Sequence, residues 1–434
     1  MFDTKPPVEK AILVGIQLPD DPEWEVHYSL DELASLADTA GVSTLETCWQ
    51  ARDKPHPGTF VGKGKVEEIK MLATELEADV IIFDTELTPA QLRNLEKALE
   101  IQVMDRSDVI LVIFSERAKT REAKLQVDLA RMKYFMPRMK RLWTHLERQK
   151  GGAGMRGGMG EKQIEIDRRI VRKKISKYEA DLKDIEQQRQ RRNSWRREMF
   201  SIALIGYTNV GKSTLFNRLT EADVLVENRL FATLDSTVRQ FHMRDQKFLM
   251  TDTVGFVRKL PHHLVASFRS TLEEAREADV LLHVVDISSP ALGDQIEAVN
   301  DVLEQLDVTD KPTIFVVNKV DQLEPDQDNS SIWQHIPEDV PYVEISAKTG
   351  QNIEMLEDMI LEIFASQFVE TTIVLPLKES KFVSQAYDLG DVRSEEYLEG
   401  NRIKLVCYAP KKDVERFRKN WKDYADKRPE YASI

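Results

Sequence analysis

The sequence predicts a multidomain α/β protein with one long helical hairpin, and three observations support this prediction. Segments typical of strands and of helices alternate at the N-terminal end and again after residue 199, as they do in mostly parallel sheets. Between these regions, apolar residues repeat at heptad spacing, as in paired helices. A chain of 434 residues is also too long for one ordinary domain. We expect domains at 1–115, 116–198, 199–366 and 367–434.

Residues 1–115 are expected to form a small α/β domain. The expected strands are 11–16 and 80–83, and the expected helices are 30–40, 66–76 and 89–99. The glycine-rich turn Gly62-Lys63-Gly64-Lys65 precedes one of these helices. Such a turn could hold a phosphate, but it lacks the rest of a nucleotide fingerprint, so we favour a turn that caps the helix.

Residues 116–198 are expected to form an antiparallel helical hairpin. Two apolar seams step by four and three residues: Leu125, Leu129, Met132, Met136, Met139, Trp143 and Leu146, then Val171, Ile175, Tyr178, Leu182 and Ile185. The glycine-rich stretch 151–160 separates the seams and is expected to be the tip. Pro137 should bend or interrupt the first helix.

The charge of the chain is uneven. The net charge is −13, yet the segment from Arg117 to Arg197 holds 25 Lys and Arg against 10 Asp and Glu, a local charge of +15 that leaves −28 for the remainder. A basic segment in an acidic protein is expected where the partner is a phosphate backbone. The alternative is an ordinary solvated helix face.

Other compositional features exclude several classes of protein. Cys48 and Cys407 lie far apart, so neither a disulfide framework nor a zinc site is indicated. No run of about 18 apolar residues and no signal-peptide pattern occur. We expect a soluble, cytosolic protein, monomeric and without a membrane span. The C-terminal segment 367–434 is expected to be a small α/β domain, and it contains no catalytic constellation.

A phosphate-binding loop follows the apolar run 202–205 and precedes a helix. It fits G-x-x-x-x-G-K-[ST] and comprises Gly206, Tyr207, Thr208, Asn209, Val210, Gly211, Lys212 and Ser213. The backbone N–H groups can surround phosphate oxygens at a helix N-terminus. Lys212 can neutralise the β- and γ-phosphates, and the Ser213 hydroxyl can ligate Mg²⁺.

Two further motifs are expected to respond to the γ-phosphate. The first is D-x-x-G, formed by Asp252, Thr253, Val254 and Gly255; the aspartate can hold Mg²⁺ through water, and the Gly255 N–H can meet the γ-phosphate. The second comprises Phe231, Ala232, Thr233, Leu234 and Asp235, in which the Thr233 hydroxyl can ligate Mg²⁺. Loss of the γ-phosphate would release both loops, which is how a switch operates.

Two motifs predict selection of guanine. The first is N-K-x-D, formed by Asn318, Lys319, Val320 and Asp321; the Asp321 carboxylate can accept two N–H bonds that guanine offers and adenine lacks. The second comprises Ser346, Ala347 and Lys348, which offer a backbone N–H to the guanine O6. Together with the loops above, these motifs predict a Ras-like GTPase domain with a mostly parallel sheet.

The prediction for hydrolysis is less complete. Lys212, Thr233 and Gly255 are the candidate catalytic residues. Many GTPases place glutamine directly after D-x-x-G to orient the attacking water, but Phe256 stands here and has no polar group. We therefore expect slow intrinsic hydrolysis, with another group or a partner orienting the water.

The chain resembles the HflX family of ribosome-associated GTPases over nearly its whole length. Stretches outside the nucleotide domain carry the resemblance, among them 59–66, 122–130 and 160–169. The resemblance implies binding to the large ribosomal subunit and its rRNA, with the hairpin tip near the peptidyl-transferase region, and dissociation or rescue of stalled ribosomes under stress. It also implies that ATP is a candidate ligand of the N-terminal region. The tip, Arg156-Gly157-Gly158-Met159-Gly160-Glu161, lacks the family's usual proline and is one residue longer.

A second resemblance concerns the metal. The site is similar to that of GTPases with an apolar residue after D-x-x-G, which use an asparagine at the position of Asn209 to hold K⁺. This implies K⁺ beside Mg²⁺ as a cofactor. The alternative is that Asn209 only supports the loop and that ribosomes order the site.

Three functions remain open from the sequence. The favoured one is a GTP-hydrolysing switch that acts on ribosomes. The second is a GTP-dependent RNA-binding or ribosome-assembly scaffold in which hydrolysis is incidental. The third is a metabolic phosphotransferase, disfavoured because it would leave the guanine and switch motifs without a purpose.

Overall fold

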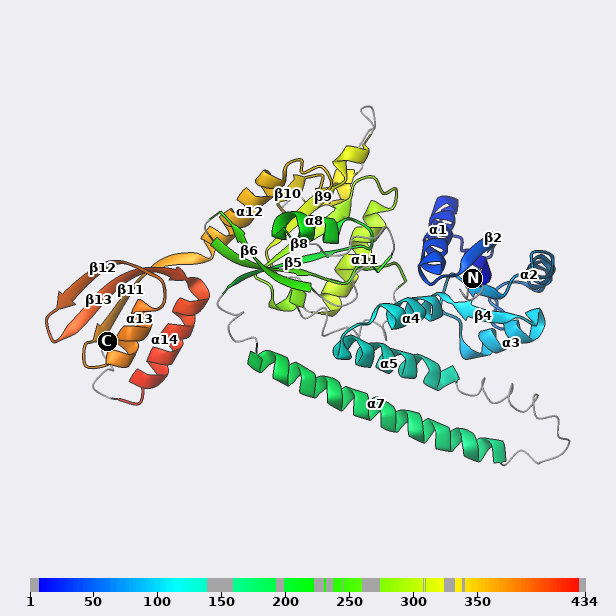
Figure 1. The fold of residues 1–434 in the computed structure, drawn as a ribbon, viewed down its shortest axis with the longest axis horizontal. Coiled ribbons are helices and arrows are strands. Elements are labelled where there is room, and N and C mark those ends of the chain that lie inside the picture. The colour runs from blue at the N-terminus through cyan, green and yellow to red at the C-terminus, as the bar shows by residue number, and fades with distance from the viewer. Residues whose placement is uncertain are drawn as a thin grey trace, which may run out of the picture. The chain divides into compact units, whose positions relative to one another are not determined.

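The structure is a computed structural model of the chain. The residues it describes are 8–138, 159–192, 199–221, 230–231, 237–244, 246–259, 274–306, 308, 310–323, 332–337 and 340–428. The chain divides into two compact units, Met1–Asn352 and Ile353–Ile434 (Figure 1). Within the described residues, no helix is long and apolar enough to cross a membrane.

The first unit begins with a four-stranded parallel sheet in the order β2-β1-β3-β4. Its strands are β1 (Lys10–Gln17), β2 (Ser43–Ala51), β3 (Val80–Phe83) and β4 (Gln102–Asp105). Its helices are α1 (Glu23–Thr39), α2 (Lys63–Glu75), α3 (Pro89–Leu99) and α4 (Arg106–Arg117). Apolar side chains of α2 and α3 share a core with Ile12 of β1 and Ile81 of β3. The strands and helices that alternate in the sequence therefore pack into one α/β layer.

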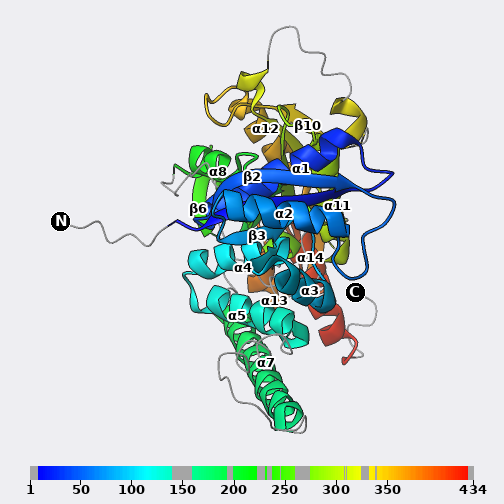
Figure 2. The same ribbon diagram turned by 90° about the vertical axis from the view of Figure 1, so that its right-hand side faces the viewer.

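The hairpin region is described on both of its arms. Helix α5 (Arg121–Phe135) is followed by a 3₁₀ turn at Met136–Arg138, so Pro137 interrupts the first helix as expected. Helix α7 (Met159–Arg192) lies alongside α5 (Figures 1 and 2), with Lys133 Nζ 2.8 Å from Glu179 Oε1.

The heptad seam of α7 is half-buried. Its members Val171, Ile175, Tyr178, Leu182 and Ile185 alternate with exposed residues. Most of the tip, residues 151–158, and the expected seam residues Met139, Trp143 and Leu146 lie outside the described residues.

A six-stranded sheet follows, in the order β10-β9-β8-β5-β7-β6. Its strands are β5 (Phe200–Gly206), β6 (Thr237–Met243), β7 (Gln246–Asp252), β8 (Val280–Asp286), β9 (Thr313–Asn318) and β10 (Tyr342–Glu344). Only the β6–β7 pair is antiparallel among these described strands. Its described helices include α8 (Lys212–Thr220) and α11 (Leu292–Gln305). The central strands β5, β8 and β9 are almost wholly buried, which explains their continuous apolar runs.

The second unit is built on a three-stranded antiparallel sheet in the order β11-β13-β12. The strands are β11 (Phe368–Pro376), β12 (Asp391–Leu398) and β13 (Arg402–Pro410), and the helices are α12 (Ile353–Ser366), α13 (Ser380–Tyr387) and α14 (Lys411–Ala425). Residues 353–366, which the sequence assigns to the nucleotide domain, thus form the first helix of this unit. Phe382 and Phe417 pack on the buried side chains of β11 and β13.

Candidate functional site

The phosphate-binding loop connects β5 to α8 at the carboxyl end of the central strand. Its two glycines occupy positions that no other residue fits. Gly206 has φ +142°, and a Cβ there would lie 2.2 Å from the Val284 carbonyl oxygen; Gly211 has φ +97°, and its Cβ would lie 2.3 Å from Asn318 Nδ2. Close backbone approach therefore explains both glycines.

The Lys212 side chain lies along the inside of this loop. Its ammonium donates hydrogen bonds to the carbonyl oxygens of Gly206 at 3.0 Å and Tyr207 at 2.6 Å. Burial lowers the pKa of Lys212 to about 8, against the opposing effect of the Asp252 carboxylate. The structure therefore places a buried cationic group at the N-terminus of α8.

Two candidate metal ligands lie side by side. The Ser213 hydroxyl donates to Asp252 Oδ2 at 2.7 Å, and Asp252, the last residue of β7, is fully buried. Hard divalent cations prefer such oxygen donors. The third candidate ligand, Thr233, lies outside the described residues with Ala232, Leu234 and Asp235. Phe231 is described and packs edge-on against Phe114 of α4, with ring centroids 4.6 Å apart.

The backbone after D-x-x-G is joined to the phosphate-binding loop. The Thr208 N–H donates to the Phe256 carbonyl at 2.7 Å, and the Phe256 N–H donates to the Gly206 carbonyl at 3.2 Å. Gly255 lies so close to the loop that a Cβ there would be 2.7 Å from Thr208 Cγ2 and 3.0 Å from Lys212 Nζ. Phe256 is buried, so its side chain packs in the core.

The two guanine motifs meet through Asn318, the last residue of β9. Its Nδ2 donates to the Val210 carbonyl at 2.8 Å, and its Oδ1 accepts from the Ala347 N–H at 2.9 Å. One carboxylate oxygen of Asp321 accepts from the Ser346 hydroxyl at 2.7 Å. The structure thus brings together the loop 206–213 and both motifs.

The remaining predicted residues surround this centre. Thr253 and Val254 are buried between Asp252 and Gly255, and Val320 is half-buried in the 3₁₀ turn Val320–Gln322 that contains Asp321. Asn209 is exposed in a left-handed conformation, and Lys348 is exposed beyond Ala347.

One supporting residue was missed from the sequence. Asp286, at the end of β8, forms a 2.6 Å ion pair with Lys319 and so fixes the lysine of N-K-x-D. A carboxylate directly after the buried strand 280–285 was the available signal.

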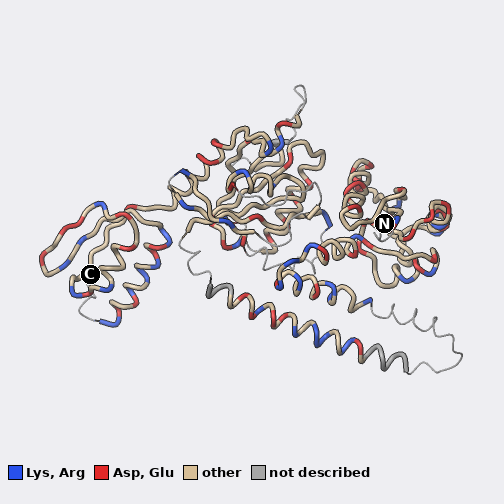
Figure 3. Tube along the Cα trace, viewed as in Figure 1, with Lys and Arg blue, Asp and Glu red and all other residues tan. Residues whose placement is uncertain are grey.

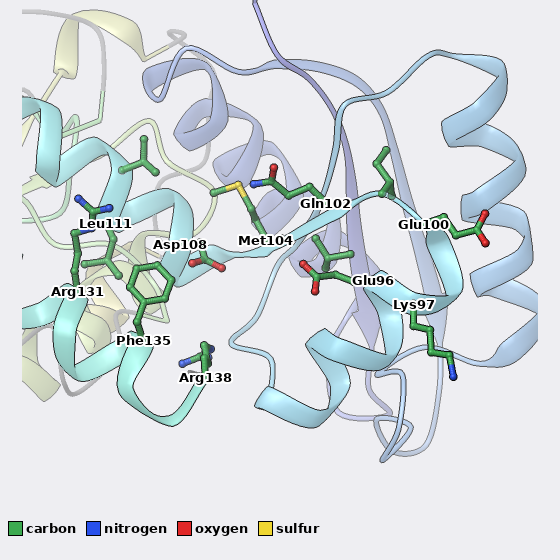
Figure 4. A pocket seen from close by; sticks show the side chains of 13 residues that line it. Glu96, Lys97, Glu100, Gln102, Met104, Asp108, Leu111, Arg131, Phe135 and Arg138 are labelled. Carbon is green, nitrogen blue, oxygen red and sulfur yellow. The ribbon is translucent and has the colours of Figure 1, made fainter. Parts of the chain in front are cut away.

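A pocket in the N-terminal α/β layer is separate from this site. It has a volume of about 970 Å³. Figure 4 shows it between Glu96 and Lys97 of α3 on one side and Arg131, Phe135 and Arg138 of α5 and the following turn on the other.

The glycine turn at residues 62–65 does not line the pocket. Instead, Gly62 is the N-cap of α2, and its N–H donates to Gln50 Oε1 at 2.8 Å. The capping role favoured from the sequence therefore agrees with the structure.

The mostly parallel sheet, the loop at its central strand and the order of the motifs define a P-loop GTPase domain. Family models match residues 27–115 as "GTP-binding GTPase N-terminal", 117–196 as "GTP-binding GTPase Middle Region" and 201–319 as "50S ribosome-binding GTPase". The chain is 41% identical to GTPase HflX of Escherichia coli strain K12 over 428 residues, which covers 96% of this chain and 97% of the relative.

A second relative gives the same result. GTPase HflX of Lacrimispora saccharolytica is 43% identical, with 94% of this chain and 96% of the relative covered. Among solved structures, the "crystal structure of SsGBP and GDP complex" aligns with a TM-score of 0.46 and 24% identity, covering 82% of this chain and 98% of that one. On the identity and coverage of its relatives, the chain belongs to the HflX family of GTPases. Its relatives are named GTPases, and this chain is a GTPase as well.

The close approach at Gly211 gives a test of the site. We expect Gly211→Ala to lower GDP affinity by at least about tenfold, because the new Cβ would displace Asn318 and the φ of +97° is strained for alanine. Titration with a fluorescent GDP analogue measures the effect. Gly64→Ala is the control, since a Cβ at Gly64 meets nothing within 4 Å. Equal affinities in all three proteins would contradict this account of the loop.

Proposed function

We propose that this chain is a Mg²⁺-dependent GTP-hydrolysing switch that binds the large ribosomal subunit and dissociates or rescues stalled ribosomes. The observation that carries the proposal is the Asn318 contact, which joins a phosphate-binding loop to two guanine-reading motifs. The match to a model described as "50S ribosome-binding GTPase" supports the choice of partner.

The proposal assigns phosphate binding to residues 206–213, with Lys212 beside the β- and γ-phosphates and the Gly255 N–H at the γ-phosphate. Gly255 already lies against the loop near Lys212. Ser213 and Asp252 would hold Mg²⁺, together with Thr233. The ion would neutralise charge on the phosphate oxygens as the bond to the γ-phosphate breaks.

Base selection is assigned to Asp321 and to the backbone of Ser346–Lys348. We expect Asp321→Asn to weaken GTP binding by roughly a hundredfold or more and to favour xanthosine nucleotides, because an amide can donate to the additional xanthine carbonyl. Competition binding with the two nucleotides measures the change. Asp310→Asn, at an exposed position in the turn before β9, is the matched control. An unchanged base preference in the Asp321→Asn variant would show that Asp321 does not read the base.

Because the usual glutamine is absent, we propose that K⁺ assists hydrolysis at this site. Asn209 is exposed on the phosphate-binding loop in a left-handed conformation, and no hydrogen bond to its side chain occurs among the described residues. A carboxamide oxygen at this position suits a monovalent cation, which would supply positive charge near the β–γ bridge.

We expect replacement of K⁺ by Na⁺ at constant ionic strength to slow GTP hydrolysis, because the smaller ion does not match such a site. Asn209→Ala should abolish the difference between the two salts. Phosphate release is the measurement, made with and without ribosomes. Equal rates in both salts under both conditions would exclude this role for K⁺.

The ribosome contact is assigned mainly to the basic segment 117–197. On α7, residues 168–177 contain six Lys and Arg and no Asp or Glu, and Arg172, Lys173 and Lys174 are exposed. Figure 3 shows Lys and Arg along this helix. An exposed cationic surface of this kind suits rRNA phosphates. The tip, residues 151–160, is proposed to reach the peptidyl-transferase region.

We expect the triple change Arg172→Gln, Lys173→Gln and Lys174→Gln to weaken binding to large subunits and to reduce the salt slope of log affinity by up to about three. Co-sedimentation over a range of salt concentrations measures both. The same change at Lys411, Lys412 and Arg416, exposed residues of α14, alters the net charge equally and serves as the control. Equal effects of the two triples would show that only overall charge matters.

The second candidate function is a GTP-dependent RNA-binding or assembly scaffold, which the apolar Phe256 keeps open. Large stimulation of GTP turnover by large subunits, without stimulation by generic RNA, favours the switch over the scaffold. ATP is a candidate ligand of the N-terminal region, where the pocket of Figure 4 offers Lys97, Arg131 and Arg138 as cationic groups.

A further inference from the structure

The side chain of Tyr207 leaves the phosphate-binding loop and enters the N-terminal α/β layer. The residue is only 4% exposed, and its hydroxyl donates to Glu32 Oε1 of α1 at 2.5 Å. The two residues are 175 positions apart in sequence. A residue of the nucleotide site is therefore anchored by a carboxylate from another domain.

That carboxylate is itself rigidly held. The Arg106 guanidinium, 1% exposed, donates to Glu32 Oε2 at 2.5 Å and to Asp84 Oδ1 at 2.7 Å. Buried charges of this kind are stable only when they are paired in good geometry. The arrangement Asp84–Arg106–Glu32 consequently fixes the point to which Tyr207 is attached.

Tyr207 also holds the segment that follows D-x-x-G. The Arg258 backbone N–H donates to the Tyr207 hydroxyl oxygen at 2.5 Å. With the two backbone hydrogen bonds of Phe256 described above, residues 206–208 make three hydrogen bonds to this segment. Of these three hydrogen bonds, the one that the tyrosine hydroxyl accepts depends on the N-terminal domain, because Glu32 holds that hydroxyl.

The protonation of Tyr207 is consistent with both contacts. Burial, and secondarily the Glu32 charge, raise the pKa of Tyr207 well above its usual value. The phenol therefore keeps its single proton at neutral pH and directs it to Glu32. The oxygen lone pairs remain available to accept the Arg258 N–H.

We propose that Tyr207, held by Glu32 of the N-terminal domain, is a positioning residue for GTP hydrolysis. It acts through the backbone of residues 255–258, whose placement against Lys212 decides where the Gly255 N–H meets the γ-phosphate. Because Phe256 has no polar side chain, accurate backbone placement matters more here than in a site with glutamine. The N-terminal domain thus contributes to the reaction without touching the nucleotide.

The test is steady-state GTP hydrolysis by the full chain. Tyr207→Phe removes one hydroxyl and keeps the buried ring. We expect its kcat to fall about tenfold, which corresponds to the loss of one good hydrogen bond in the transition state. KM and GDP affinity should stay within about twofold, because phosphate and base contacts are unchanged. This split between kcat and KM separates positioning from damage to the binding site.

Tyr28→Phe is the matched control. The Tyr28 hydroxyl accepts from Gln295 Nε2 at 2.8 Å and so joins the same two domains through the same chemical group. Among the described residues it makes no hydrogen bond to residues 206–213 or 255–258, although the Arg258 charge acts on it. It should hydrolyse GTP at the original rate. Equal losses in the two variants, or a rate in Tyr207→Phe equal to or faster than the original, would overturn the proposal.

A second variant tests whether the two residues act as a unit. Glu32→Gln keeps the shape of the side chain but replaces the charged acceptor of the Tyr207 proton. We expect it to slow hydrolysis in the original chain and to have no further effect in Tyr207→Phe, since the hydroxyl is then absent. Additive losses in the double variant would show that Glu32 acts by another route and would overturn the pairing.

Discussion

The nucleotide site depends on one buried amide. Asn318 is 2% exposed, and it donates to the Val210 carbonyl while it accepts from the Ala347 N–H. A carboxamide side chain offers a donor and an acceptor side by side at every pH. The loop that faces the phosphates and the loops that face the base are therefore parts of one hydrogen-bonded unit, and Gly211 must be glycine because it packs directly on that amide.

The coupling between the N-terminal layer and the GTPase domain has a different physical basis. It consists of charged groups that cross between the two: Lys259 Nζ lies 2.6 Å from Asp84 Oδ2, and Arg258 pairs with Glu25. Arg106 holds Asp84 in place from within the N-terminal layer. Desolvation offsets much of the attraction in such pairs. Their contribution is geometric, because a short ion pair with a buried or half-buried partner tolerates few arrangements. A site placed by such contacts is sensitive to the relative position of the domains.

The outline of the fold was predictable where packing imposes a strong local pattern. The buried strands β5, β8 and β9 are continuous apolar runs, as a sheet covered on both faces requires. Four strands, β2, β4, β6 and β12, were not predicted. β2 is mostly half-buried or exposed, and β12 is almost wholly exposed with the sequence DVRSEEYL. Each is a sheet edge, where backbone pairing with a neighbour and not side-chain burial makes the strand.

The sequence by itself determined that this chain belongs with guanine-nucleotide-binding GTPases, because the residues that recognise phosphate, metal and base lie in short contiguous motifs. Only the tertiary structure decided how those motifs are held. The pairing of Glu32 with Tyr207 leaves no local signature, since the chain segments that carry them are far apart and meet through folding. The position of Asp286 could be read from the end of its strand, but its pairing with Lys319 could not. The direction of the Tyr207 side chain, out of the loop and into another domain, is a property of that packing.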